Sequence, residues 1–302
     1  MKKYSTVILA LFLLVTCLFS GCITIDQPEN NNKIKENTYI VDGNGKGNFT
    51  YIQDAIDAAP ENYTIFVYSG HYIENILINK TIDLIGENPQ TTYIDANGSK
   101  DGIYITADYV NVSNFSIINS GTASYQDYDA GIQLDSNHNT IQNCIFYNIT
   151  YGIYSSWVSH NHVHNNTFKY ASEYGIYAFS SSNHMKIIDN HFYLNKVSLR
   201  IKGSNNCQVI GNKFNNSEKG MYFCCGAKNN VAYHNVFIEH SIYNGDDQVG
   251  GNTWYDEINR EGNYWDDYKG VDEDGDGIGD IPYNITHIGR QDIYPLMNPK
   301  NN

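Results

Sequence analysis

A phenylalanine returns at nearly constant spacing through the second half of this chain. The members are Phe146, Phe168, Phe192, Phe214 and Phe237, at intervals of 22, 24, 22 and 23 residues. Around them the same pattern recurs: an Asn-rich turn, an apolar residue, Asn, Phe, and then in most repeats Gly-Ile-Tyr. A self-similar period of this length is typical of a solenoid of stacked coils and not of a globular sandwich.

Aligning the chain on this phenylalanine column, with Ile117 as its first member, places other residues in columns as well. One apolar column contains Ile141, Val163, Ile187, Val209 and Ala232. Three residues further on stand Cys144, Asn166, Asn190, Asn212 and Asn235. A second strand supplies Ile103, Ile132, Ile153, Ile176, Leu199 and Met221. We interpret the Asn column as an internal ladder of amides that hydrogen-bond turn backbone, with the phenylalanines stacked beside it.

The repeat length also predicts the architecture. About 22 residues are too few for two helices and a turn, but they suffice for two or three short strands with tight turns. Leucine-rich repeats have a similar period, but their leucine framework is missing here. We therefore expect an all-β right-handed parallel β-helix, in which like residues stack at about 4.8 Å along the axis.

The start of the chain predicts export. Lys2 and Lys3 precede an apolar run from Val7 to Phe19, which is short for a membrane span and typical of a signal peptide. Phe19-Ser20-Gly21-Cys22 resembles a lipoprotein lipobox with Phe in place of the usual Leu, which predicts a lipid on Cys22. Ordinary cleavage nearby and free secretion is the alternative. The expected localisation is the outer face of the cytoplasmic membrane or the cell surface.

Four regions follow from these patterns. We expect a signal peptide over residues 1–21, a flexible Asn-rich tether over 22–38, the β-helix over 39–262 and a C-terminal cap over 263–302. The formal charge is −14, and loss of Lys2 and Lys3 makes it −16. Such a charge argues against nucleic acid as a partner and suits a soluble monomer at a surface or a protein that binds cations.

One helix is expected, directly after the first strand. Thr50-Tyr51-Ile52-Gln53 has the spacing of a capping box, with Thr50 as the N-cap and Gln53 reaching back. Ile52, Ala55, Ile56 and Ala59 then fall on one helical face, and Pro60 marks the end. An amphipathic helix at this place could cover the open edge of the first coil.

Several of these segments resemble a known group of proteins. Val41-Asp42-Gly43, the stretch from Phe49 to Ile56, Ile65 to Glu74 and Ile82 to Gly86 resemble the start of pectin-lyase-fold proteins. The later coils resemble the NosD-type family, also described as carbohydrate-binding and sugar-hydrolysis domains. The resemblance covers roughly residues 39–265 and implies the β-helix fold. It leaves function open, because that fold hosts lyases, hydrolases, esterases, epimerases and non-catalytic surface proteins.

An outward column suggests a sugar-binding face. The residue after each inward Ile of the second strand points the other way, and these residues are Tyr104, Gln133, Tyr154, Tyr177, Arg200 and Tyr222. Tyrosine offers an apolar ring and a hydroxyl, which suits contact with a polysaccharide or cell-envelope glycan. The alternative is that tyrosine simply favours β surfaces.

A histidine column suggests a transition metal. His138, His160 and His184 each stand eight residues before a phenylalanine. Imidazoles one coil apart could bind a divalent metal such as copper, to which the name of the NosD family refers. The alternative is a turn ladder in which His replaces Asn.

The C-terminal region contains an acidic loop with the ligand order of an EF-hand. Carboxylates stand at loop positions 1, 3, 5 and 9 as Asp272, Asp274, Asp276 and Asp280, with the carbonyl of Ile278 at position 7. Tyr283 replaces the usual Glu at position 12, and no helices are expected to flank the loop. We expect a calcium site that stabilises the cap; a solvated acidic loop is the alternative.

Four aspartates could take part in catalysis. Weak candidates for an acid and a base are Asp101, Asp127, Asp129 and Asp135, around the long loop of one coil. Arg200-Ile201-Lys202 resembles an element of polygalacturonases, but the other catalytic elements of these relatives do not align. The sequence therefore favours a lipid-anchored, calcium-stabilised surface protein that binds glycan. The alternatives are a polysaccharide-active lyase, hydrolase or epimerase, and a NosD-like copper-handling protein.

Overall fold

The computed structural model describes residues 37–123, 127–287 and 289–300. The predicted signal peptide, Cys22 and most of the tether lie outside these residues. In the described part of the chain, no helix has the length and apolar character that crossing a membrane requires.

Apart from β27 (Tyr283–Asn284) and β28 (Gln291–Asp292), which pair antiparallel, the strands of the described residues form three parallel sheets. Sheet 1 contains, in spatial order, β1 (Thr38–Val41), β2 (Tyr63–Val67), β5 (Ile82–Gly86), β8 (Asn111–Ser113), β11 (Thr140–Gln142), β14 (His162–His164), β17 (Lys186–Ile188), β20 (Gln208–Ile210) and β23 (Val231–Tyr233). Sheet 2 contains β3 (Gly70–Ile73), β6 (Thr92–Asp95), β9 (Ser116–Ile118), β12 (Ile145–Tyr147), β15 (Thr167–Lys169), β18 (His191–Tyr193), β21 (Lys213–Asn215), β24 (Val236–Ile238) and β26 (Tyr264–Trp265). Sheet 3 contains β4 (Ile76–Ile78), β7 (Ile103–Ile105), β10 (Ala130–Leu134), β13 (Tyr151–Ser156), β16 (Tyr174–Phe179), β19 (Val197–Lys202), β22 (Lys219–Cys224) and β25 (Tyr243–Asp247).

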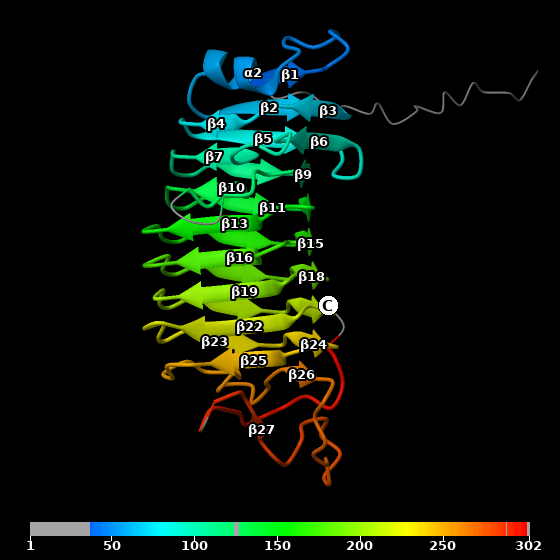
Figure 1. The fold of residues 1–302 in the computed structure, drawn as a ribbon, viewed down its shortest axis with the longest axis vertical. Helices are drawn as coiled ribbons and strands as arrows, with labels where there is room; N and C mark the ends of the chain where they lie inside the picture. Colours follow the sequence, from blue (N-terminus) through cyan, green and yellow to red (C-terminus); the bar gives the residue numbers. More distant parts are fainter. Residues whose placement is uncertain (1–36, 124–126, 288, 301–302) are drawn as a thin grey trace, which may run out of the picture. The chain divides into compact units, whose positions relative to one another are not determined.

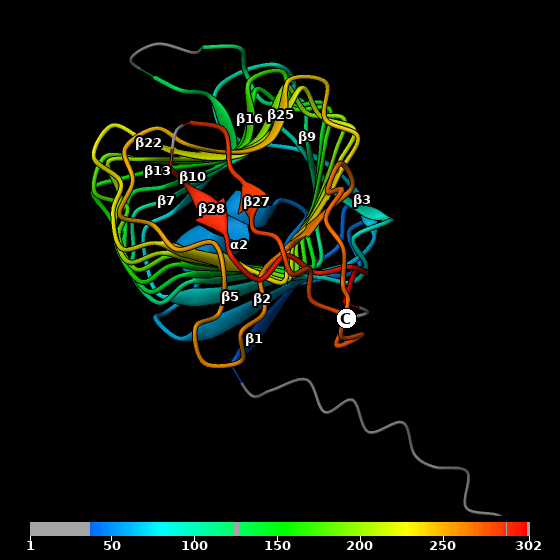
Figure 2. The same ribbon diagram turned by 90° about the horizontal axis from the view of Figure 1, so that it is seen from below.

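The sheets wind as one solenoid. Along the chain a strand of sheet 3 is followed by one of sheet 1 and one of sheet 2, and the next coil repeats the order, as in β13, β14 and β15. Successive coils follow the chain order along one axis (Figure 1). Viewed along that axis, the three sheets form the sides of the coil (Figure 2). The predicted right-handed parallel β-helix is confirmed.

The phenylalanine column is a continuous stack inside the solenoid. Its five members pair in register from β12 to β24 and are fully buried. The ring centroids of successive members lie 4.6, 4.9, 4.8 and 4.8 Å apart. Trp265 of β26 extends the stack, with its ring 4.3 Å from Phe237 and 4.2 Å from Tyr283 of β27 (Tyr283–Asn284). Sheet 2 thus continues into the segment that we expected to form the cap.

The asparagine column is the predicted amide ladder. The side-chain oxygen of Asn190 accepts hydrogen bonds from the backbone N–H of Asn166 at 3.0 Å and from its side-chain amide at 3.1 Å. The amide of Asn190 in turn donates to the carbonyl of Val163 at 2.9 Å. Asn212 and Asn235 repeat this arrangement. Each amide therefore satisfies turn backbone that burial would otherwise leave unpaired.

The glycine of the recurring Gly-Ile pair makes room for the phenylalanine stack. A Cβ added to Gly152 would lie 2.5 Å from Cδ1 of Phe168 and 2.2 Å from the carbonyl oxygen of Gly175. At Gly175 it would lie 2.8 Å from Cδ1 of Phe192. All three separations are shorter than side chains tolerate, so the recurring glycine and the recurring phenylalanine depend on each other.

The predicted capping box is wrong, although the helix is present as α2 (Ile52–Ala58). Its N-cap is Tyr51, and no side-chain cap bond is made there. Instead the carboxylate of Glu74 accepts the backbone N–H groups of Ile52 and Gln53, both at 2.9 Å. Gln53 binds the backbone of Leu77 in β4 through both amide atoms. A residue more than 20 positions away therefore does the capping, which a local pattern cannot show.

Candidate functional site

The outward column of sheet 3 is present in the predicted register. Tyr104, Gln133, Tyr154, Tyr177, Arg200 and Tyr222 pair in succession, and Asp246 follows them. Tyr154, Tyr177 and Tyr222 are nevertheless only 5, 4 and 7% exposed. Their rings therefore serve as a packed layer on the outside of the sheet and offer little free ring face.

A second column, not singled out from the sequence, covers these tyrosines. The ring of Tyr174 stacks on Tyr177 at 4.7 Å, and that of Tyr128 stacks on Tyr154 at 4.5 Å. The resulting aromatic face consists of Tyr128, Tyr151, Tyr154, Tyr174, Tyr177, Phe179, Tyr222 and Tyr243. The signal for the second column was the residue two before each inward Ile, which is Tyr151 and Tyr174 in successive repeats.

Arg200 lies in the middle of this face. Its Nη1 donates to the hydroxyl of Tyr174 at 2.9 Å, and its Cζ lies 5.1 Å from the ring centroids of Tyr177 and Tyr222. Within the described residues, no carboxylate lies within ion-pair distance of Arg200. Lys202, two residues on in β19, holds its Nζ 4.5 Å from the ring of Phe179. The face is therefore locally cationic in an acidic chain, and its cations rest on aromatic rings.

Two polar hollows border the strand-start edge of sheet 3. One of about 430 Å³ is lined by Ser172, Leu194, Asn195, Lys196, Asn216, Ser217, Glu218, Glu239 and Ser241. The other, of about 380 Å³, is lined by Asn97, Gly98, Asn119, Ser120, Thr122, Asn148, Ile149, Thr150 and Ser172. Ser172 lies two residues before the start of β16, and Glu218 lies directly before the start of β22, so the polar groups of the hollow lie next to the aromatic face.

The four candidate catalytic aspartates fall into two places. Oδ1 of Asp101 accepts the backbone N–H of Ala130 at 2.7 Å, which brings Asp101 next to the coil that carries Asp127 and Asp129. Burial, opposed by that hydrogen bond and reinforced by the two neighbouring carboxylates, raises the pKa of Asp101 to about 7. Asp135 instead accepts a hydrogen bond from the hydroxyl of Tyr104 at 2.8 Å. Asp101 can therefore exchange a proton near neutral pH.

The histidine column is a stack of parallel rings. The ring centroids of His138 and His160 lie 4.9 Å apart, those of His160 and His184 4.7 Å, and Tyr109 stacks on His138 at 4.9 Å. Desolvation and the two neighbouring imidazoles lower the pKa of His160. Parallel rings direct their nitrogen lone pairs side by side, whereas a shared metal needs them to converge.

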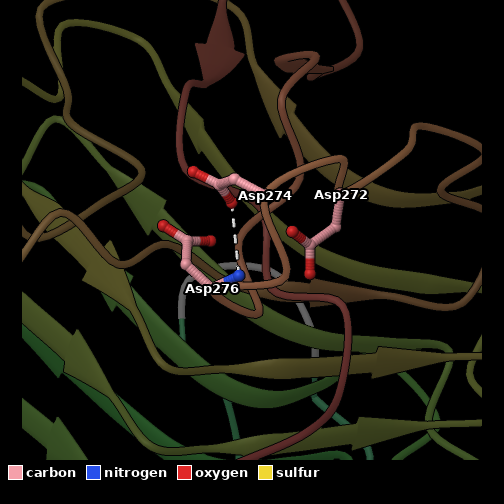
Figure 3. Close-up of side chains that lie close together, drawn as sticks. All are labelled: Asp272, Asp274 and Asp276. Carbon is pink, nitrogen blue, oxygen red and sulfur yellow. Dashed lines mark hydrogen bonds between the residues drawn. The ribbon is translucent and has the colours of Figure 1, made fainter.

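The aspartate loop brings three of its predicted ligands together. Ligand oxygens of Asp272, Asp274 and Asp276 all lie within 4.8 Å of one another (Figure 3). The backbone folds around them, because Asp272 accepts the N–H groups of Gly275 at 2.7 Å and Gly277 at 3.0 Å. Asp280 is turned to another partner, since its Oδ2 accepts the N–H of Glu273 at 2.7 Å. The backbone N–H of Ile278 bonds Asp276 at 2.8 Å.

Comparison with known proteins assigns the family. The sequence model of the family described as "Periplasmic copper-binding protein (NosD)" matches residues 30–270. This chain belongs to the NosD family.

Its curated relatives are matched over part of their length. A cell surface glycoprotein of Methanothermus fervidus is 30% identical over 145 residues, which are 47% of this chain and 21% of the relative. Probable pectinesterase 56 of Arabidopsis thaliana is 36% identical over 107 residues, 30% of this chain and 36% of the relative. This chain thus spans well under half of either protein. The solved pectin methylesterase of Aspergillus niger aligns with a TM-score of 0.51 at 12% identity, covering 72% of this chain and 84% of that one, and supports the fold alone.

The description of the family names copper, but the described residues contain no group of three nitrogen or sulfur donors that could hold a copper ion. In the part of the chain that the structure describes, the His, Cys, Asp and Glu residues form one group of three with converging ligand atoms, and it is the aspartate trio. Carboxylate oxygens in such a loop suit calcium, whereas copper prefers imidazole or thiolate. The histidine stack does not supply the missing geometry.

Proposed function

We propose that this chain is an exported, lipid-anchored surface protein that binds an acidic polysaccharide on the outer face of sheet 3. The observation that carries this proposal is Arg200, a partly buried cation that rests on aromatic rings without a carboxylate partner among the described residues. A sugar carboxylate would supply the anionic partner that the guanidinium of Arg200 lacks among the described residues.

The chemistry of the face fits such a ligand. A guanidinium matches a carboxylate with two parallel N–H donors, and aromatic rings pack against the C–H face of a sugar. The exposed rims of Tyr128, Tyr174 and Phe179, with Arg200 and Lys202, supply this contact, while the tyrosines beneath them hold the rims in place. The hollows beside the face add hydroxyl and amide groups for the sugar hydroxyls.

The comparisons agree with this choice of ligand. Two of the matched proteins are named for pectin, and the M. fervidus relative is named as a cell surface glycoprotein. Together with the predicted signal peptide and lipobox, these names favour a glycan of the cell envelope or its surroundings as the partner.

Binding of oligogalacturonate and of a neutral cello-oligosaccharide by the mature protein, measured by calorimetry, tests the proposal. We expect the acidic oligomer to bind, and Arg200→Gln to weaken it at least about tenfold, the effect of losing one charge-assisted hydrogen-bonded pair. Lys213→Gln is the matched control, because Lys213 is an exposed cation on β21 of sheet 2. Equal loss in both variants, or equal binding of the two oligomers, would refute the proposal.

Acid–base catalysis at Asp101 is the second candidate. A carboxyl group with a pKa near 7 beside two further carboxylates can act as a general acid or base at neutral pH. Incubation with a panel of polysaccharides should then release reducing ends or 4,5-unsaturated products, and Asp101→Asn should abolish the release. The absence of any product over the panel would leave the chain as a binding protein.

Copper handling is the third candidate, and the family's description favours it. Copper binding at the histidine stack would require its parallel rings to turn so that their nitrogens converge. His160→Ala should then lower copper affinity, and equal affinity in the two proteins would exclude the stack.

We also propose structural roles for the two ends of the solenoid. The buried residues of α2 join the core at β1, β2 and β4, where the helix can close the first coil. The C-terminal segment, with calcium in its aspartate loop, can close the last one.

A further inference from the structure

Two neighbouring cysteines at the end of β22 form a pair of free thiols beside Arg200. Cys224 is buried on the outer side of sheet 3, and Cys225 is exposed. Their Sγ atoms lie 3.2 Å apart. Cys225 has a φ of 57° and Gly226 a φ of 93°, so the chain turns sharply here and brings the second thiol back over the first.

Arg200 contacts the inner thiol with two donors. Its Nε and its Nη2 both lie 3.4 Å from Sγ of Cys224. The other two free cysteines within the described residues are arranged differently: Cys144 and Cys207 are buried and donate to backbone carbonyls such as those of Gln142 and Ser182. The Cys224–Cys225 pair is thus a dithiol in which the sulfur of Cys225 is accessible and the sulfur of Cys224 contacts the guanidinium of Arg200.

The separation of the two sulfurs suits a metal ion with bent coordination. With a metal–sulfur distance of about 2.3 Å, two thiolates lie about 3.8 Å apart at a tetrahedral angle and about 4.6 Å apart at a linear one. The observed separation is 3.2 Å, so tetrahedral binding would move the two sulfurs about 0.6 Å further apart. Soft ions that accept thiolates in this geometry include Cd²⁺, Zn²⁺ and Cu⁺.

We propose that Cys224 and Cys225 bind one soft, thiophilic metal ion as a pair of thiolates, with the Arg200 guanidinium donating hydrogen bonds to the Cys224 thiolate. On binding, two S–H bonds break, two sulfur–metal bonds form and two protons pass to solvent, and no electron is transferred. The site lies apart from the aspartate loop and uses donors of the opposite hardness, so calcium and the soft ion do not compete.

Burial, partly offset by the hydrogen bonds from Arg200, raises the pKa of the Cys224 thiol to about 11. The free Cys224 thiol is therefore protonated at neutral pH, and metal affinity should rise with pH.

Titration of the reduced mature protein with Cd²⁺, followed by the sulfur-to-metal charge-transfer absorption in the ultraviolet, tests the site. We expect one equivalent to bind, and Cys224→Ser and Cys225→Ser each to abolish the band. Cys207→Ser is the matched control and should retain it. Arg200→Gln should lower the affinity at least about tenfold, since a pair of charge-assisted contacts is lost.

Circular dichroism of each variant verifies that the β-helix is intact, and Cys225→Ser serves where the buried Cys224→Ser fails to fold. A wild-type protein without the band, or a band that persists in Cys225→Ser, would overturn the proposal. Binding of oligogalacturonate by Cys225→Ser should be unchanged, so that failure of the metal site and failure of the glycan site are separate results.

Discussion

Asp292 ends the amide ladder by binding Asn263, its last asparagine. Oδ2 of Asp292 accepts the backbone N–H of Asn263 at 2.7 Å and its side-chain amide at 3.2 Å, and Asn263 passes the ladder on to Asn235. The same oxygen accepts Nε1 of Trp265 at 3.0 Å. A carboxylate from β28 (Gln291–Asp292) thus takes the place of the amide oxygen that a further coil would have supplied.

Asp292→Ala should destabilise the fold. The change leaves buried donors of Asn263 and Trp265 unpaired, at a cost of about 1–3 kcal/mol for each donor that water cannot reach. Urea denaturation gives the free energy of unfolding. Glu257→Ala, an exposed acid of the same C-terminal region, is the control, and an equal effect of both changes would contradict the role given to Asp292.

Within the ladder, Asn190→Ala should cost at least about 2 kcal/mol, because several buried backbone groups lose their partner at once. Gln208→Ala removes an exposed amide from the neighbouring coil and should change stability by less than about 0.5 kcal/mol. Similar values for the two variants would show that the ladder does not stabilise the solenoid.

Gly152→Ala should cost roughly 1–3 kcal/mol, since its Cβ would collide with Phe168 and with backbone of the next coil. Ser198 occupies the equivalent place in β19, where the coil already accommodates a Cβ. Ser198→Ala should therefore cost about 1 kcal/mol or less, the value of its hydrogen bond to Ser217. Thermal unfolding of the two variants gives the comparison, and an equally stable Gly152→Ala protein would rule out the steric argument.

The raised pKa of Asp101 should make the free energy of unfolding depend on pH. Its folded pKa of about 7 lies above the ordinary value of 3.8, so the protonated form is favoured by folding. The stability that it contributes is complete below about pH 3.8 and is lost as the pH rises through 7. Asp101→Asn keeps the acceptor for Ala130 and cannot ionise. Its free energy of unfolding, relative to wild type, should therefore increase between pH 5 and pH 8; a constant difference would contradict the raised pKa.

Calcium should raise the melting temperature, and chelation should lower it again. At a free concentration of one hundred times Kd, a single site adds about 2.7 kcal/mol. Asp274→Asn should reduce the shift, whereas Glu273→Gln, in the same loop but outside the aspartate trio, should retain it. A melting temperature that does not respond to calcium would show that the loop is only a solvated acidic turn.

The columns could be predicted from sequence because each is a repeated local pattern. Asn190 stands two residues before Phe192, and the same spacing recurs at Asn166, Asn212 and Asn235. Alternation along a strand therefore predicts that both side chains of each pair face inward, the asparagine at the turn and the phenylalanine in the stack. The tyrosine column was found in the same way. Its burial was not, because that depends on the neighbouring column and on Tyr128, which comes from the long loop of another coil.

Contacts made once could not be predicted. Glu74 caps α2, Arg200 contacts Cys224 on the neighbouring strand β22, and Asp292 closes the ladder, each through a pairing with no counterpart in the other coils. The local sequence does not show the partner of any of these residues. The candidate sites of this chain therefore lie where the repeat is interrupted, which is where sequence reasoning has least to work with.

The ladder has a consequence for how such a chain changes length. The coils from Asn166 to Asn235 each present an asparagine and a phenylalanine to the coil before and the coil after, so one of these coils can be duplicated or deleted without interrupting the ladder or the stack. An insertion of one residue, by contrast, would shift every column of its coil to the wrong face. Length in this family should therefore evolve in whole-coil steps, with the single-copy closing contacts of Glu74 and Asp292 carried along unchanged at the two ends.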